Sequence, residues 1–473
     1  MTDLNVKITP IYAPDFMLIS LPNELANIIG AGAQLDLENP KLNCFLLHEW
    51  LHYTHNTSTI NGMYCFTAMI ILWSDFRWKL DATGISTPLD TLSLNHAKAV
   101  RRNYSLFQNG RRPRSNPVEL TRSRNDFQVV SARTVDEPLL QSMDDHSEKG
   151  TVIKCDVILG SEPVAYAAEI GALEIIEGLA YLCEERYMAI FKDCPPTPPI
   201  APYQLIYKLS RYLVPNISRD DVIACAITAL QSSDAPQVFF KLMSSLGKID
   251  PSVRRNALAD YQVKILDANI TQIQNLATTM EGYFPKHEEM ASAVKYIASL
   301  MERNLHNRRA TPFFELDALD HLKSTSEETR ATTLGRIIAD LTCCRILAEG
   351  HGDLDQPCRD KIVFYGNPQD MTDERSFGSH KLHAALHYMK LHLSEDGFMD
   401  TQAVKEHVDP VRRRCPYYTA CHFELRKQQP TMCKESPWES ILSPMPVGQS
   451  CWYREGVRAT RRPDNEGQVS RPA

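Results

Sequence analysis

The chain has 473 residues and an ordinary composition, with 43% hydrophobic and 23% charged residues and a formal net charge of −7. This length is sufficient for a large core and for two or three domains. The acidic balance argues against a protein that coats nucleic acid or an anionic membrane. The most apolar stretch, 60–73, is shorter than the roughly 20 residues that a membrane span needs.

The N-terminus has neither a basic segment leading into an apolar run nor a small-residue cleavage site, so we expect no secretory signal. The 13 cysteines are odd in number and scattered, which favours reduced thiols over a disulfide framework. Together these features predict a cytoplasmic protein that has no membrane partner. They do not indicate an oligomeric state.

The first 80 residues predict two short strands followed by helix. Apolar and β-branched residues punctuated by prolines indicate strands at about 6–11 and 16–21. From about 41 to 80 the apolar pattern is helical, and Asn61-Gly62 marks a point where the helix can break.

This predicted helix carries the HExxH motif HEWLH at 48–52. Residues four apart on a helix lie about 40° apart around its axis, so His48 and His52 can bind one Zn²⁺. Glu49 is turned by about 100° from His48, toward a water on the metal instead of the metal itself. Glu49 is therefore a candidate general base.

A catalytic zinc site needs a third protein ligand. A metzincin site would require Gly at position 55 and His at position 58, where the chain has His55 and Ser58, so this type is excluded. His55 shares a helix face with His48, and it is a partner of a ligand, an alternative ligand or an ordinary histidine near the helix end.

Residues 81–160 have a different composition. Seven arginines between 101 and 124 lie among polar residues, glycine and proline, which predicts an exposed loop, with a contact to substrate or nucleic acid as the alternative. Strands are expected at 127–130 and 151–159. A long helix is predicted at 165–191. The Pro-rich segment 195–199 ends this helix and marks a domain boundary.

The helix predicted at 165–191 offers a third ligand in the segment EIIEGLAYLCE at 174–184. Glu177 and Glu184 are seven residues apart and share a face, while Gly178 and Ala180 allow a neighbour to approach closely. Glu174, about 60° away around the helix, is the rival ligand.

HEWLH together with EGLA at 177–180 resembles the gluzincin metallopeptidases, including their aminopeptidase-type branch, whose ligand helix often carries EGxA. The resemblance implies that His48, His52 and Glu177 bind zinc and that Glu49 is the general base. It implies hydrolysis of peptide bonds in a protein or peptide substrate by a metal-activated water. The segment 81–160 would then be an insertion between the two ligand helices.

Such an enzyme also needs a hydrogen-bond donor to the transition state. The candidates near the third ligand in sequence are Tyr166, Tyr181, Tyr203 and Tyr207. Two alternatives come from other classes: a non-proteolytic metal-binding regulatory or interaction protein, and a zinc hydrolase that acts on other substrates.

Amphipathic helices are expected after the Pro-rich segment. Met290, Val294, Ile297 and Met301 form one apolar stripe, which predicts core. Near the C-terminus, Cys415, Cys421, Cys433 and Cys451 are candidates for a second, structural zinc ion or an iron–sulfur cluster, and otherwise are free or buried thiols.

Overall, the sequence predicts a mainly α fold of the α+β type with a small β component. A zincin-like catalytic domain is expected at 1–194, with the insertion at 81–160, and a helical domain at 200–350. A Cys- and His-rich module is expected at 351–455, and a disordered tail at 456–473.

Overall fold

A computed structural model describes most of the chain: residues 11–13, 18–22, 40–81, 84–86, 100, 103–104, 107, 114–138, 149–284, 288–341, 345–349, 360–366, 373–394, 397–418, 421, 423–445 and 451–461. Within these residues the fold is mainly helical, with small antiparallel sheets. The predicted fold class, mainly α with a small β component, is confirmed at this level.

The helix predicted at about 41–80 is observed as two helices, α1 (Pro40–Thr57) and α2 (Ile60–Phe76). Thr59 caps α2, because its side-chain oxygen accepts a hydrogen bond from the backbone N–H of Gly62 at 3.0 Å. A Cβ on Gly62 would lie 2.1 Å from the carbonyl oxygen of Asn56, so glycine is required for this close turn. The break therefore falls just before the Asn61-Gly62 pair.

The segment predicted as one helix at 165–191 is a strand followed by a helix, which corrects the prediction. β5 (Ala165–Ile170) pairs antiparallel with β4 (Lys149–Leu159), and α4 (Ala172–Ile190) begins after Gly171. Pairing within the sheet outweighs the helix propensity of the alanines in β5.

The strands lie in separate sheets. The three-stranded sheet has the order β3-β4-β5, and β3 (Phe127–Pro138) is longer than the predicted strand at 127–130. The four-stranded sheet has the order β1-β2-β7-β6. Its strands are β1 (Ile11–Ala13), β2 (Leu18–Pro22), β6 (Arg345–Glu349) and β7 (Asp360–Gly366). The N-terminal strands thus pair with β7, which comes from the predicted C-terminal module.

Helices dominate the rest of the chain. The central helices are α5 (Leu205–Leu213), α6 (Arg219–Ala229), α7 (Ala235–Leu246), α8 (Arg254–Ala268), α9 (Ile270–Gly282), α10 (Glu288–Ala310), α11 (Phe314–Ser324) and α12 (Glu327–Leu341). The C-terminal elements are α13 (Asp373–Leu391), β8 (Leu393–Ser394), β9 (Gly397–Phe398), α14 (Thr401–His407), α15 (Pro410–Arg413), α16 (Glu424–Gln428), α17 (Pro430–Glu435) and α18 (Trp452–Thr460). Short 3₁₀ helices are η2 (Arg77–Lys79), η3 (Val118–Thr121), η5 (Pro251–Val253) and η6 (Pro437–Leu442), and η4 (Ile200–Gln204) is a short π-helical segment. The predicted stripe of α10 is buried, as expected.

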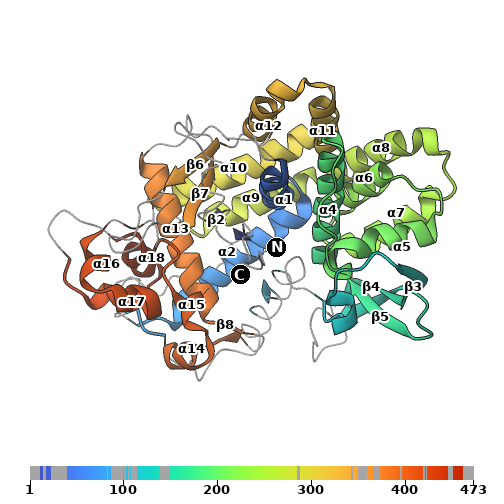
Figure 1. Ribbon diagram of the computed structural model, residues 1–473. Helices are drawn as coiled ribbons and strands as arrows, with labels where there is room; N and C mark the ends of the chain where they lie inside the picture. Colours follow the sequence, from blue (N-terminus) through green and yellow to red (C-terminus); the bar gives the residue numbers. More distant parts are fainter. Residues whose placement is uncertain are drawn as a thin grey trace, which may run out of the picture.

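One hydrophobic cluster runs through the molecule and includes buried residues from Ile19 to Val457. The three-stranded sheet and α5–α8 lie at one end of the molecule, and α14–α18 lie at the other (Figure 1). Between them, α1 packs against α4. This packing brings the HEWLH helix next to the EGLA helix.

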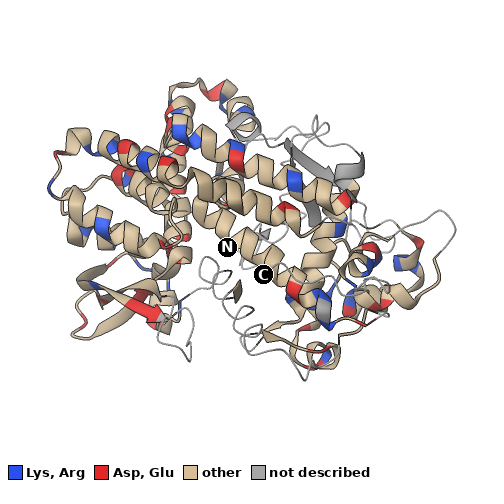
Figure 2. Ribbon diagram, turned by 180° about the vertical axis from the view of Figure 1, so that it is seen from behind, with Lys and Arg blue, Asp and Glu red and all other residues tan. Residues whose placement is uncertain are grey.

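Basic and acidic residues are interspersed over most of the helices, whereas α1 and α2 carry few charges (Figure 2). No helix of the described residues is long and apolar enough to cross a membrane. The prediction of a disordered tail at 456–473 is wrong for its first residues, because α18 continues to Thr460, whose buried hydroxyl accepts a hydrogen bond from Nε1 of Trp73 at 3.1 Å. Residues 462–473 of that tail lie outside the described residues.

Candidate metal centre

α1 and α4 bring together the three residues predicted to bind zinc. One ligand atom from each of His48, His52 and Glu177 lies within 4.8 Å of the other two. Oε2 of Glu177 lies 3.2 Å from Nε2 of His48 and 3.3 Å from Nε2 of His52. Imidazole nitrogen and carboxylate oxygen are ligands that zinc accepts. These three residues can therefore hold a metal ion.

Gly178 allows the chain after the Pro-rich segment to approach α4. A Cβ at this position would lie 2.6 Å from Cγ1 of Ile206 and 3.0 Å from the carbonyl oxygen of Tyr203. The close approach sets the Tyr203 ring 6.0 Å from the His48 ring, measured between centroids. The small residue thus has the packing role that the sequence predicted for it.

Glu184 contacts His48 on the nitrogen that faces away from Glu177. Its Oε1 lies 2.6 Å from Nδ1 of His48. A carboxylate on the second nitrogen of a ligand histidine fixes the orientation of the ring and raises its basicity. The spacing of seven residues placed Glu184 on the face of Glu177 but did not assign it this role.

We expect Glu184→Gln to weaken zinc binding by about 10- to 100-fold, because glutamine keeps the size of the side chain but loses its charge. Calorimetric titration of metal-depleted protein with Zn²⁺ measures the affinity. Glu185→Gln is the matched control: Glu185 pairs with Arg219 at 2.8 Å, away from the ligands, and its loss should leave zinc affinity unchanged. Wild-type affinity in Glu184→Gln would contradict the role of Glu184.

The charges of three carboxylates, Glu49, Glu177 and Glu184, act on Tyr203 beside the metal ligands. Burial raises the pKa of Tyr203, and the negative charges of Glu177, Glu184 and Glu49 raise it further. Although burial lowers the pKa of His48, Glu177 and Glu184 raise that pKa well above its ordinary value. A bound divalent cation would replace the proton on His48, because a ligand histidine must be neutral. The excess of negative charge favours a cation at this centre.

Glu174, the rival ligand, is committed elsewhere. Its Oε1 accepts a hydrogen bond from the backbone N–H of Arg114 at 2.8 Å, and its Oε2 accepts one from the backbone N–H of Gly171 at 2.8 Å. Both carboxylate oxygens therefore hold the start of α4. Of the two candidates, Glu177 is the one that lies beside the histidines.

His55 lies outside the ligand group and contacts a buried ion pair. Its Nε2 lies 3.3 Å from Oε1 of Glu315. Arg308 donates to both carboxylate oxygens of Glu315, at 2.7 and 3.1 Å, and also donates from Nε to the carbonyl oxygen of Ser58 at 2.9 Å. Burial lowers the pKa of His55, which favours its neutral form. The cluster joins the end of α1 to α10 and α11, and no local pattern pointed to Arg308 or Glu315.

Tyr203 is the candidate donor that lies beside the ligands. A cavity of about 250 Å³ adjoins it and is lined by Tyr181, Tyr203 and Tyr207 and by the charged residues Glu185, Lys208 and Arg219, among others. Tyr166 instead donates from its hydroxyl to Glu162 at 3.1 Å. Tyr203 thus connects the cavity to the metal ligands, since it lines the cavity and also lies beside His48.

No protein-family model, curated protein or solved structure matches this chain. The resemblance to gluzincins therefore depends on HEWLH and EGLA alone.

The four cysteines of the predicted second metal site, Cys415, Cys421, Cys433 and Cys451, line one pocket. They come from separate segments of the C-terminal region, and all four are free thiols. The four cysteines that were predicted to form one site are thus close in space, although none of their spacings along the chain is the tight CxxC of a zinc knuckle.

Proposed function

We propose that the protein is a zinc-dependent metallopeptidase of gluzincin type, with a zincin-like arrangement of α1 and α4. His48, His52 and Glu177 would bind the zinc ion, and Glu49 would be the general base. The observation that carries the proposal is the approach of the three ligand atoms to within 4.8 Å. An accidental HExxH sequence on a helix has no reason to face the glutamate of a distant EGLA segment.

Bound zinc would polarise the scissile carbonyl and lower the pKa of water at the site. Glu49 then takes a proton from the attacking water and passes it to the leaving amine. Its side chain is shielded from solvent, since the residue is 9% exposed, and this shielding strengthens its electrostatic interactions.

Tyr203 would stabilise the oxyanion that develops on the substrate. Burial raises the pKa of its hydroxyl, so the hydroxyl stays protonated and can donate a hydrogen bond. The adjoining cavity would take a substrate side chain next to the scissile bond. Its wall combines aromatic surface with a Glu185–Arg219 ion pair at 2.8 Å, which suits a peptide with both apolar and polar groups.

We also propose that the enzyme works in the cytoplasm. The cysteines in the described part of the chain, from Cys44 in α1 to Cys451 at the start of α18, are free thiols. Reduced thiols in such number are typical of cytoplasmic proteins.

The direct test is digestion of a peptide mixture of diverse sequence by the zinc-loaded protein, with the products identified by mass spectrometry. We expect defined cleavage that a chelator abolishes and that added Zn²⁺ restores. Intact peptides and intact unfolded protein substrates after incubation with fully zinc-occupied protein would contradict peptidase activity.

A further inference from the structure

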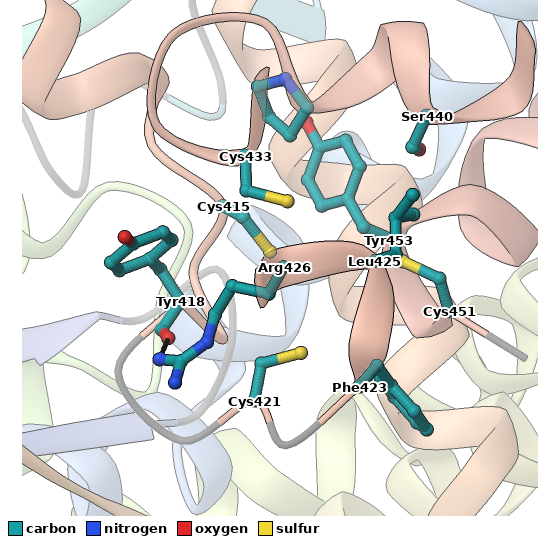
Figure 3. A pocket seen from close by; sticks show the side chains of 11 residues that line it. Cys415, Tyr418, Cys421, Phe423, Leu425, Arg426, Cys433, Ser440, Cys451 and Tyr453 are labelled. Carbon is teal, nitrogen blue, oxygen red and sulfur yellow. Dashed lines mark hydrogen bonds between the residues drawn. The ribbon is translucent and has the colours of Figure 1, made fainter. Parts of the chain in front are cut away.

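The C-terminal pocket collects four cysteines from four segments of the chain. Cys415 follows α15, Cys421 precedes α16, Cys433 lies in α17 and Cys451 precedes α18. Figure 3 shows their sulfur atoms directed toward one common space. The segments are held in place by the backbone, since the N–H of Cys415 donates to the carbonyl oxygen of Cys433 at 3.0 Å.

Burial distinguishes these thiols from solvent-exposed ones such as Cys194. Cys415 and Cys421 are buried, and Cys433 and Cys451 are half-buried. Burial raises the pKa of Cys433 to about 12 and that of Cys451 to about 11. Thiols in such a setting become thiolates when a metal coordinates them, because the metal supplies the compensating charge.

A positive charge lies at the pocket in Arg426. Its Nη1 donates to the carbonyl oxygen of Tyr418 at 2.5 Å, and its guanidinium lies over the ring of the same tyrosine at 5.3 Å. In Figure 3 the side chain of Arg426 runs between Cys415 and Cys421. A guanidinium at this position offsets part of the negative charge of four thiolates.

The distances between the sulfur atoms distinguish a site for a single zinc ion from a site for an iron–sulfur cluster. Among the described residues, His48, His52 and Glu177 are the group of three or more whose ligand atoms all lie within 4.8 Å of one another, so no three of the four sulfurs are that close together. Four thiolates on one zinc ion, with bonds of about 2.3 Å, lie only about 3.8 Å apart. Thiolates on the corners of a four-iron cluster lie roughly 6 Å apart.

The pocket itself agrees with the wider spacing. It contains a cavity of about 20 Å³ bordered by the four cysteines. Sulfurs closed around a single zinc ion leave no space for a water-sized void between them. A void of this size holds about one water molecule, so the inorganic core of a cluster would occupy it together with the space between the separated sulfur atoms.

We propose that Cys415, Cys421, Cys433 and Cys451 bind an iron–sulfur cluster, which ties α15, α16, α17 and α18 together. The proposal is independent of the metallopeptidase function, because the cysteines lie in the C-terminal region and share no residue with the HEWLH centre.

The test is the iron and acid-labile sulfide content of the full-length protein, purified without oxygen from iron-supplemented cells and then reconstituted with ferrous iron and sulfide. We expect iron and sulfide in about equal amounts, about two to four of each per chain, with a broad visible absorbance. Protein without sulfide after reconstitution would overturn the proposal. So would zinc at the four cysteines in place of iron.

Variants show whether these residues are the ligands. Cys421→Ala and Cys451→Ala should lose most of the iron, sulfide and visible absorbance, whereas Cys194→Ala, at an exposed thiol, should keep them. Circular dichroism checks that the variants are folded. If they are not folded, the iron and sulfide content of the wild-type protein remains the test of cluster binding. Full iron and sulfide content in folded Cys421→Ala and Cys451→Ala would reject this ligand set.

Discussion

Glu49→Gln is expected to lower kcat/KM for peptide hydrolysis by about 10²- to 10⁴-fold while zinc content stays at the wild-type level. Glutamine has nearly the same size but cannot accept the proton of the attacking water. Glu49 is not among the residues whose ligand atoms gather at the centre, so its substitution should spare metal binding. Kinetics and metal analysis on the same protein sample measure both quantities.

The control for Glu49→Gln is Glu327→Gln, which makes the same chemical change at an exposed position of α12. This variant should hydrolyse peptides at the wild-type rate. Unchanged hydrolysis in Glu49→Gln would exclude Glu49 as the base. A biological effect that persists in Glu49→Gln would favour the alternative of a non-proteolytic metal-binding regulator.

Arg308→Met should lower the free energy of unfolding by about 3–5 kcal/mol, because it leaves the buried carboxylate of Glu315 without its partner. Both side chains are fully buried, and their ion pair has a shortest distance of 2.7 Å. Urea denaturation followed by tryptophan fluorescence measures the loss. The double variant Arg308→Met/Glu315→Leu should lose less than Arg308→Met, because it leaves no unpaired charge. A double variant less stable than Arg308→Met would contradict this explanation.

The same ion pair should make stability depend on pH. Burial alone would raise the pKa of Glu315, but Arg308 and His55 lower it to about 2, from an ordinary value of 4.5. A carboxyl whose pKa is lower in the folded state contributes stability that is complete above about pH 4.5 and is lost as the pH falls toward 2. The double variant lacks this carboxyl, so its stability should fall less steeply across that window.

Local patterns predicted the helices well and long-range pairing poorly. The boundaries of α1 and α2 follow from caps and apolar spacing, which depend on neighbouring residues. The prediction of helix for β5 is wrong because this segment forms a strand only through its pairing with β4, which its own residues do not indicate. The pairing of β2 with β7 joins segments far apart in the chain, and the periodicity of apolar residues in a strand does not indicate which strand it pairs with.

The candidate site shows the same division. Helical spacing was enough to propose His48, His52 and Glu49, and the resemblance to a known ligand helix suggested Glu177. The roles of Glu184, Tyr203 and the Arg308–Glu315 pair depend on how closely separate helices approach, which the sequence does not encode in any local pattern. The position of a glutamate on the helix face was not sufficient to identify the ligand, since the carboxylate of the rival Glu174 caps its own helix.

The most direct test of the metal centre is the zinc content of purified wild-type protein beside three variants. We expect wild type and Glu174→Ala to retain the zinc ion of the HEWLH centre, about one per chain, and His48→Ala and Glu177→Ala to lose it. Zinc that is retained in Glu177→Ala but lost in Glu174→Ala would contradict the account.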